Sequence, residues 1–442
     1  MKKMINLIKI QIWSLIICLL VVISSCELDD IQDPNNPSIG SIETNATISE
    51  LQNLLDGIQA AMRNEYGIYF DGVSVIGREV YRFSGSDPRY TGELMGASSG
   101  ILDAGAFYTQ NTYNARYRVV KNCNILITAV KNTKAALSDE QRKALNGLAK
   151  TIKAHELLMV FNQQFDNGIR VQVEDPDHLG PFLDKTASLN AIAALLDEAS
   201  ADLKSGGAAF ALKLGKGFIG FDNPTSFLKF NRALSARVNA YRENWDGVNA
   251  SLLESFINEN GDFKSGVYYI FSKSGGDILN EVFYPLNVSG EVRLAHPSYI
   301  ADADANDTRV NKAKKRNAAT TSNGLTSEYD FALYATNTDP IPLIRNEELI
   351  LLEAEYYIQK GLTIEAVRTL NIIRNASGLA DYSGASDKDG LIRELLKQRR
   401  YSLFGEGHRW IDMRRYNKLS ELPIDRAGDD VWIKFPKPAN EN

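Results

Sequence analysis

Two amphipathic segments joined by a glycine constrain the fold of this chain more than any other feature of its sequence. Residues 346–361 and 363–378 each repeat apolar side chains at three- and four-residue steps, which predicts two helices. Gly361 separates them, Thr363 is the expected N-cap of the second helix, and Gly378 is its expected end. Small and aromatic residues have the spacing of a degenerate tetratricopeptide hairpin, at Ala354, Tyr357, Gly361 and Ala366.

A third helical segment, residues 389–416, alternates arginine with glutamate and aspartate around Phe404 and Trp410. Such paired charges suit either catalysis or a buried network of arginine–carboxylate pairs that holds the last helices together. No recognisable catalytic motif surrounds them. We therefore interpret them as a structural network, to which Glu406 and Arg409 are expected to belong.

Two motifs of this region, LNIIRNASGL (370–379) and QRRYSLFGEGHRWIDMRR (398–415), resemble the carboxyl-terminal signature of the SusD/RagB family of outer-membrane nutrient-binding lipoproteins. Gln398 and Ser402 depart from it, since the family has glutamate there. The matching positions are Asn371, Arg374, Gly378, Arg399, Arg400, Leu403, Glu406, Gly407, Arg409, Asp412 and Arg415. The resemblance implies a lipoprotein that passes its ligand to a TonB-dependent, SusC-like outer-membrane transporter.

The first 25 residues are predicted to be a signal peptide rather than part of the fold. Three lysines precede an apolar stretch, residues 12–23, that is too short to span a membrane. The sequence Ile23-Ser24-Ser25-Cys26 is typical of a lipobox, in which Cys26 becomes the lipid-modified amino terminus. We expect residues 26–49 to be the lipidated linker. Acidic residues after Cys26, as in exported Bacteroidetes lipoproteins, favour a surface-exposed position on the cell outer membrane.

Charge and cysteine content exclude several classes of function. Removing the signal peptide takes away three lysines and no acidic residue, so the formal net charge falls from −6 to −9. This charge argues against nucleic acid as a partner. Cys123 is left unpaired, so neither a disulfide within the chain nor a cysteine-based metal site is expected. The histidines are scattered without ligand spacing, and we expect no metal and no cofactor.

Further amphipathic segments make the expected fold class all-α. We expect tetratricopeptide-like helix hairpins to form a superhelical frame over residues 50–442, with two long irregular insertions at about 64–110 and 261–338. Ser138 and Gln141 have the spacing of a capping box at the start of one helix. The expected helices before the carboxyl-terminal part are 48–63, 113–130, 138–165, 188–203, 226–242 and 245–257.

The two insertions are the expected ligand site. Both are rich in aromatic residues within irregular chain, and aromatic rings stack on sugars while charged groups bind their hydroxyls. In the first insertion a charged group and a ring cluster around Pro88, and in the second two rings adjoin prolines. The residues that we predict to contact a ligand are Arg82, Asp87, Arg89, Tyr90, Tyr284 and Tyr299.

Two weaker patterns lie in the second insertion. Asp302, Asp304 and Asp307 hint at calcium, but the glycine and the closing glutamate of an EF-hand are missing. A basic run, Lys312 with residues 314–316, could attract phosphate, although we interpret it as a solvated loop.

The function predicted from these observations is capture of an oligosaccharide at the cell surface and its transfer to the transporter, without catalysis. A peptide-binding or protein-scaffold member of the same fold is the alternative. A lipid-anchored glycosidase is less favoured, because two carboxylates would suffice for it but none stands in a recognisable catalytic context.

Overall fold

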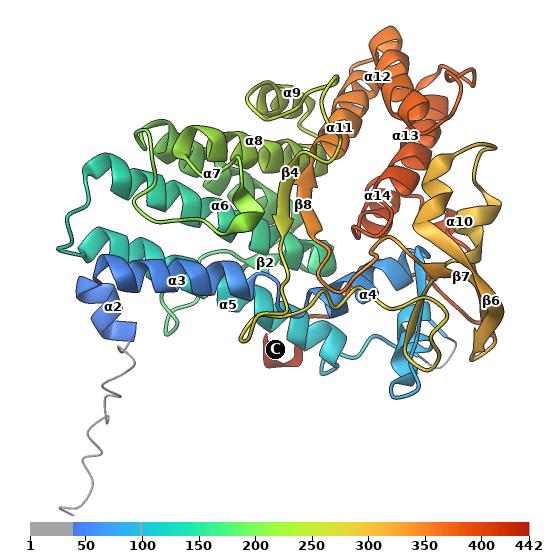
Figure 1. Cartoon of the computed structure of the whole chain (residues 1–442), viewed down its shortest axis with the longest axis horizontal. Helices are drawn as coiled ribbons and strands as arrows, with labels where there is room; N and C mark the ends of the chain where they lie inside the picture. The colour runs from blue at the N-terminus through green and yellow to red at the C-terminus, as the bar shows by residue number, and fades with distance from the viewer. Residues whose placement is uncertain (1–38, 98–99, 442) are drawn as a thin grey trace, which may run out of the picture.

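The computed structural model describes residues 39–97 and 100–441. Helices form most of this part of the chain, and small sheets lie between them (Figure 1). The expected signal peptide, residues 1–25, lies outside the described residues, as do Cys26 and the first part of the linker. No described helix is both long and apolar enough to cross a lipid bilayer.

The amino-terminal half is a row of helices that pack mainly against their neighbours in the sequence. Figure 1 shows α5 to α8 lying side by side, with α3 against α5. All the helices predicted for this half are present, although α5 begins earlier than predicted. The bounds are α2 (Ile39–Asn45), α3 (Ile48–Ala61), α5 (Phe107–Asn132), α6 (Asp139–Gln164), α7 (Lys185–Lys204), α8 (Pro224–Tyr241) and α9 (Trp245–Leu253).

Helix α6 shows how the local sequence determines where a helix of this row begins and how closely it packs against the next. The predicted capping box is confirmed: the Ser138 hydroxyl accepts from the Gln141 N–H at 3.2 Å, and the Gln141 side chain accepts from the Ser138 N–H at 3.0 Å. Further along, a Cβ atom on Gly147 would lie 2.8 Å from the carbonyl oxygen of Ala199. The missing side chain is therefore what lets α6 and α7 approach closely.

The predicted carboxyl-terminal hairpin is also confirmed. It consists of α11 (Asn346–Gln359) and α12 (Thr363–Ala376), and it has its own apolar core with α13 (Lys388–Ser402). Thr363 is not the N-cap, because the helix already includes it and Leu362 takes the cap position. The third predicted helix is divided into α13 and α14 (Arg409–Arg415), since Gly405 and Gly407 adopt φ angles of 86° and 77°. A tetratricopeptide superhelix built from such pairs stays a prediction.

The expected all-α class is confirmed for the helix-rich frame but not for the insertions, which form strands. Short runs such as EVYRF carry the β-branched and aromatic residues that favour strands. One antiparallel sheet has the order β1-β5-β7-β6, and it pairs the first insertion with the second. Its strands are β1 (Val80–Phe83), β5 (Val292–Ala295), β7 (Leu325–Phe331) and β6 (Ala313–Ser322). Two smaller sheets pair β4 (Gly266–Tyr269) with β8 (Ile341–Arg345), and β2 (Ile169–Arg170) with β3 (Phe182–Leu183).

The first insertion also contains a helix that its sequence did not reveal. In α4 (Tyr66–Ile76) nearly every residue is buried, so apolar and small side chains occur on all sides. A helix of this kind has no amphipathic period to detect. It is followed at once by β1, which is therefore fixed to the core at its start.

The segment after α14 returns to the amino-terminal half, where Figure 1 marks the carboxyl terminus. The Asp430 N–H donates to the Met95 carbonyl oxygen at 3.0 Å, and the Phe435 N–H donates to that of Gln163 at 2.9 Å. The Phe435 side chain is fully buried. This segment, residues 423–435, is therefore part of the core rather than a loose tail.

Candidate functional site

Arg82 lies at the centre of the residues that the sequence predicted to contact a ligand. It stands on β1 opposite Arg293 of β5, and its Nη2 donates to the Tyr284 hydroxyl at 2.8 Å. Its Cζ lies 5.0 Å from the ring centroids of both Tyr90 and Tyr284. The two insertions therefore meet here. We name Arg82, Tyr90, Tyr284 and Glu291 the arginine–tyrosine cluster.

Glu291 gives the cluster a carboxylate that solvent can reach. It forms an ion pair with Arg82 and accepts a hydrogen bond from the Ser84 hydroxyl at 2.7 Å, while its side chain stays 41% exposed. Burial acts to raise the pKa of Glu291, but the bonds from Ser84 and Arg82 outweigh it and lower the pKa to about 2. The group is therefore charged at neutral pH and free on one side to accept from a hydroxyl.

A buried aspartate fixes the cluster from behind. Asp71 pairs with Arg293 at 2.5 Å, and its other oxygen lies 3.4 Å from Nε of Arg82. The side chains of Asp71 and Arg293 are almost fully buried. Because one carboxylate holds two arginines, the positions of the Arg82 guanidinium and the Tyr284 ring are determined before any ligand arrives.

The predicted turn around Pro88 forms the rim of the cluster. It is a short 3-10 helix, η1 (Pro88–Tyr90), in which the Asp87 side chain accepts from the Arg89 N–H at 3.0 Å. Asp87 also pairs with the Arg89 guanidinium at 2.6 Å, and this guanidinium lies over the ring of Phe107. The Arg89 side chain is 37% exposed, so part of its guanidinium is open to solvent.

Burial changes the role of the other two predicted tyrosines. Tyr90 is only 8% exposed, with Arg82 over its ring and Phe107 at its edge, so it supports the cluster rather than presenting a ring face. Tyr299 lies in α10 (Pro297–Ala301), is 1% exposed, and stacks on Phe404 with ring centroids 3.9 Å apart. Its burial leaves no ring face open to solvent, and we remove Tyr299 from the candidate ligand contacts.

Most of the acidic and basic residues in these two patterns of the second insertion form ion pairs or hydrogen bonds with other residues of the protein. Each of the three aspartates has a cationic partner: Asp302 with Arg400, Asp304 with Lys397 and Asp307 with Arg309. The described residues contain no group of three or more ligands suited to a metal ion. Residues 314–316 of the basic run lie on β6, where Lys314 and Lys315 are exposed, while Lys312 is half-buried and donates to the carbonyl oxygen of Tyr401 at 2.8 Å.

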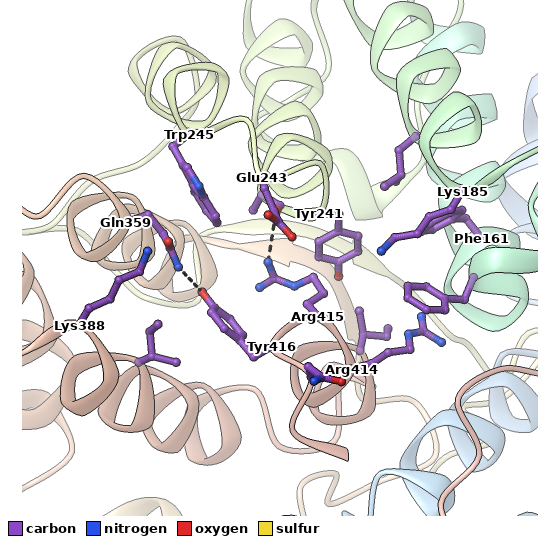
Figure 2. Close-up of a pocket in the computed structure, with 16 residues that line it drawn as sticks. Phe161, Lys185, Tyr241, Glu243, Trp245, Gln359, Lys388, Arg414, Arg415 and Tyr416 are labelled. Carbon is purple, nitrogen blue, oxygen red and sulfur yellow. Dashed lines mark hydrogen bonds between the residues drawn. The ribbon is translucent and has the colours of Figure 1, made fainter. Parts of the chain in front are cut away.

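A pocket between the helices is a site that the sequence did not predict. It has a volume of about 310 Å³, and its lining side chains come from α6, α7, α8, α9, α11, α13 and α14 (Figure 2). We call it the interhelical pocket. Its aromatic lining consists of Phe161, Phe165, Tyr241, Trp245 and Tyr416, and its charged lining of Lys185, Glu243, Lys388, Arg414 and Arg415.

The carboxyl-terminal side of this pocket is held by hydrogen bonds from behind. The Tyr416 hydroxyl donates to Glu355 at 2.6 Å and accepts from the Gln359 amide at 3.2 Å. Arg415 pairs with Glu355 at 2.9 Å and donates to the Ala240 carbonyl oxygen at 3.1 Å. Figure 2 shows these side chains facing Tyr241 and Trp245 from the other side of the pocket. The Tyr416 ring and the Arg415 guanidinium are thus positioned independently of any ligand.

Little in the sequence could have revealed this pocket, because its walls come from segments far apart in the chain. The one local signal is an aromatic residue at a helix end or just beyond it. Trp245 follows the turn after α8, where Glu243 has a φ angle of 58°, and Tyr416 follows α14 directly. Aromatic residues at such ends can face a cavity rather than the buried side of a helix.

Comparisons with known proteins agree on one family. Residues 301–432 match the model of the SusD family. SusD-like protein P38 of Formosa agariphila is 36% identical over 104 residues, which is 21% of this chain and 21% of that protein. That match thus spans about a fifth of the relative's own length.

Solved structures share the fold over most of the chain. A SusD superfamily protein from Bacteroides vulgatus has a TM-score of 0.64 at 18% identity, covering 89% of this chain and 96% of its own. Surface glycan-binding protein A from Bacteroides thetaiotaomicron has a TM-score of 0.69 at 13% identity, with the same coverage. The latter protein has also been solved in complex with laminarihexaose, with a TM-score of 0.69. Residues 301–432 thus match the SusD family model, and 89% of the chain shares the fold of a SusD superfamily structure.

Proposed function

We propose that this protein is a cell-surface lipoprotein that binds an oligosaccharide and passes it to a TonB-dependent, SusC-like transporter in the outer membrane. Two solved structures of the same fold, from Bacteroides thetaiotaomicron and Bacteroides uniformis, are surface glycan-binding proteins. The fold itself does not determine the ligand. Support for a saccharide therefore has to come from the side chains of this chain.

The observation that carries the proposal is the convergence of the two insertions at the arginine–tyrosine cluster. Arg82 and Tyr284 are far apart in the sequence but share a hydrogen bond of 2.8 Å, and the carboxylate of Glu291 faces solvent beside them. Tyr284 is half-buried and Arg89 is partly exposed. A ring with donors and an acceptor around it is the combination that a pyranose with several hydroxyls requires.

Tyr284→Ala and Arg89→Ala test this site. Each should weaken binding of an oligosaccharide by about 1–2 kcal/mol, the scale of one lost ring contact or charged hydrogen bond. A glycan array identifies the oligosaccharide, and titration calorimetry measures the change. Tyr299→Phe is the matched control, because it removes one hydroxyl from a buried tyrosine and should leave affinity unchanged. Wild-type affinity in both alanine variants would place the site elsewhere.

The anchor needs a separate test, because Cys26 lies outside the described residues. We expect Cys26→Ala to leave the protein unlipidated and lost from the outer membrane, while the fold survives. Metabolic labelling with a fatty-acid analogue, followed by membrane fractionation, measures both effects. A labelled variant would contradict the assignment of Cys26.

A further inference from the structure

We propose that the interhelical pocket is a second ligand site, which takes a saccharide unit carrying an anionic group, either a uronate carboxylate or a sulfate ester. This inference goes beyond the proposed function because it assigns a different site and a charge class. Glycan capture at the arginine–tyrosine cluster does not depend on it.

The first observation is an unsatisfied hydroxyl. Tyr241 is only 7% exposed, yet among the described residues its hydroxyl has no hydrogen-bond partner. In Figure 2 this hydroxyl points into the pocket. This hydroxyl is not among the fully buried side-chain atoms that lack a partner, so it is accessible from the pocket. It can therefore bind a ligand oxygen without breaking a bond within the protein.

The second observation is an excess of positive charge. Lys185, Lys388 and Arg414 line the pocket, and none of them forms an ion pair with a carboxylate of residues 39–97 or 100–441. Glu243 is the one acidic residue among the described residues of the lining. Arg415 is already neutralised by Glu355 and Asp412. The pocket therefore attracts an anion.

Arg414 contributes a buried positive charge to this pocket. Its side chain is 6% exposed, its two terminal nitrogens donate to the carbonyl oxygens of Ile433 and Asn162, and its Nε has no partner. A buried cation is stable when an anion accompanies it, but Asp166 acts on Arg414 only from beyond ion-pair distance, so rings and carbonyl oxygens are its direct partners in the described part of the chain. Its guanidinium lies over Phe165 at 4.1 Å. An anionic ligand would complete this environment.

The third observation is the kind of surface that surrounds these charges. Trp245 and Tyr416 are half-buried rings on two sides of the pocket, and the Trp245 indole N–H has no hydrogen-bond partner in the described part of the chain. Rings that can contact the apolar face of a sugar thus stand beside donors for its oxygens. A volume of about 310 Å³ is at the lower end for ligand pockets, which suits one or two sugar units rather than a long chain.

Titration calorimetry with matched probes tests the proposal on the full chain in detergent. The probes are galacturonate and glucuronate oligomers of one to three units, galactose 6-sulfate, and neutral galactose and glucose oligomers of the same lengths. We expect one anionic class to bind at least tenfold more tightly than its neutral counterpart. The response to uronates and to the sulfate distinguishes the two anionic groups.

Two variants place the binding in the pocket. Lys185→Glu combined with Lys388→Glu changes only exposed side chains, so the fold is retained, and the anionic preference should fall at least tenfold. Tyr241→Phe keeps the ring and should weaken anionic binding about fivefold. Lys314→Glu combined with Lys315→Glu changes the net charge equally on exposed β6 positions and should have no effect.

Several outcomes would overturn the proposal: no binding of any anionic probe, equal affinity for neutral and anionic probes, or an anionic preference that survives in the Lys185/Lys388 variant. Tighter binding of a tripeptide carboxylate than of every sugar probe would overturn the saccharide assignment as well. Neutral-oligosaccharide binding that depends on Tyr284 is measured in the same experiment, and its presence or absence reports on the proposed function separately.

Discussion

Two parts of the molecule use the same arginine–carboxylate chemistry with opposite exposure. In the carboxyl-terminal network, Arg399 pairs with Asp412 at 2.7 Å and Arg345 pairs with Glu406 at 2.7 Å, and all four side chains are at most 8% exposed. In the arginine–tyrosine cluster, Arg82 is equally buried, but its partner Glu291 is 41% exposed. Pairing alone therefore does not separate a structural contact from a candidate binding site. These two regions differ in the exposure of the acidic partner.

The buried network confirms the structural interpretation of the charged carboxyl-terminal motif. Glu406 accepts from two nitrogens of Arg345, and Arg345 also pairs with Glu347. Arg409 is a correction, because it forms no ion pair with a described residue. Its guanidinium lies near Arg400, and burial lowers its pKa to about 9.

The largest expected effect comes from breaking a network pair. Glu406→Ala leaves Arg345 buried with one carboxylate fewer, so the free energy of unfolding should fall by about 3–5 kcal/mol. Urea unfolding measures this change, and glycan affinity of the folded variant should equal that of the wild type. Arg368→Ala is the control: it breaks an exposed pair with Glu259 and should cost less than about 1 kcal/mol. Normal stability with lost binding would make Glu406 part of a binding site.

A smaller effect is expected at Glu79, which lies between the two regions. Glu79 precedes β1, is 3% exposed, and accepts from the Ser74 hydroxyl at 2.9 Å and the Gly405 N–H at 3.0 Å. Burial raises its pKa to about 7. The folded state thus binds the proton of the Glu79 carboxyl group more tightly than the unfolded state does. Stability therefore falls as the pH rises from the pKa of Glu79 in the unfolded state towards 7.

Glu79→Gln removes this titration while keeping both hydrogen bonds available. Between pH 5 and pH 8 the wild type should lose up to about 3 kcal/mol of stability relative to the variant. Urea unfolding of both proteins at the two pH values gives the difference, in which all other titrating groups cancel. Parallel pH profiles would show that Glu79 is ionised in the folded state throughout.

The smallest effect on stability is expected at the exposed carboxylate. Glu291→Gln should change the free energy of unfolding by less than about 1 kcal/mol, since Arg82 keeps Asp71 at 3.4 Å. Oligosaccharide affinity should nevertheless fall, because the charged acceptor facing solvent is gone. Calorimetry and urea unfolding on the same sample test both statements. A loss of stability like that of Glu406→Ala would remove the contrast between the regions.

The sequence predicted the elements whose signals are local. The capping box at Ser138 and the hairpin of α11 and α12 depend on residues a few positions apart, and both are present. Helix α4 was missed because a helix that is buried on all sides has no period, and the sheet was missed because its strands come from two distant segments. Local propensity cannot indicate pairings of that kind.

The candidate site was predictable to a similar degree. The sequence indicated the two insertions and five residues that lie in or beside the arginine–tyrosine cluster, because charge and aromatic content mark such segments. It could not show that Tyr90 supports the cluster while Tyr284 remains half-buried, since burial depends on Phe107 and Arg82 around the ring. Tyr299 looked similar in sequence, but Pro297 begins a helix that directs it into the core.

The return of residues 423–435 to the amino-terminal half has a consequence for how the protein is made. Phe435 packs against Tyr108 and Trp410, and the Trp432 indole donates to the Glu93 carbonyl oxygen at 2.7 Å. Contacts between such distant residues form late, because a long stretch of chain must first be closed into a loop. On the ribosome, the first half cannot complete its packing until the last segment has been synthesised.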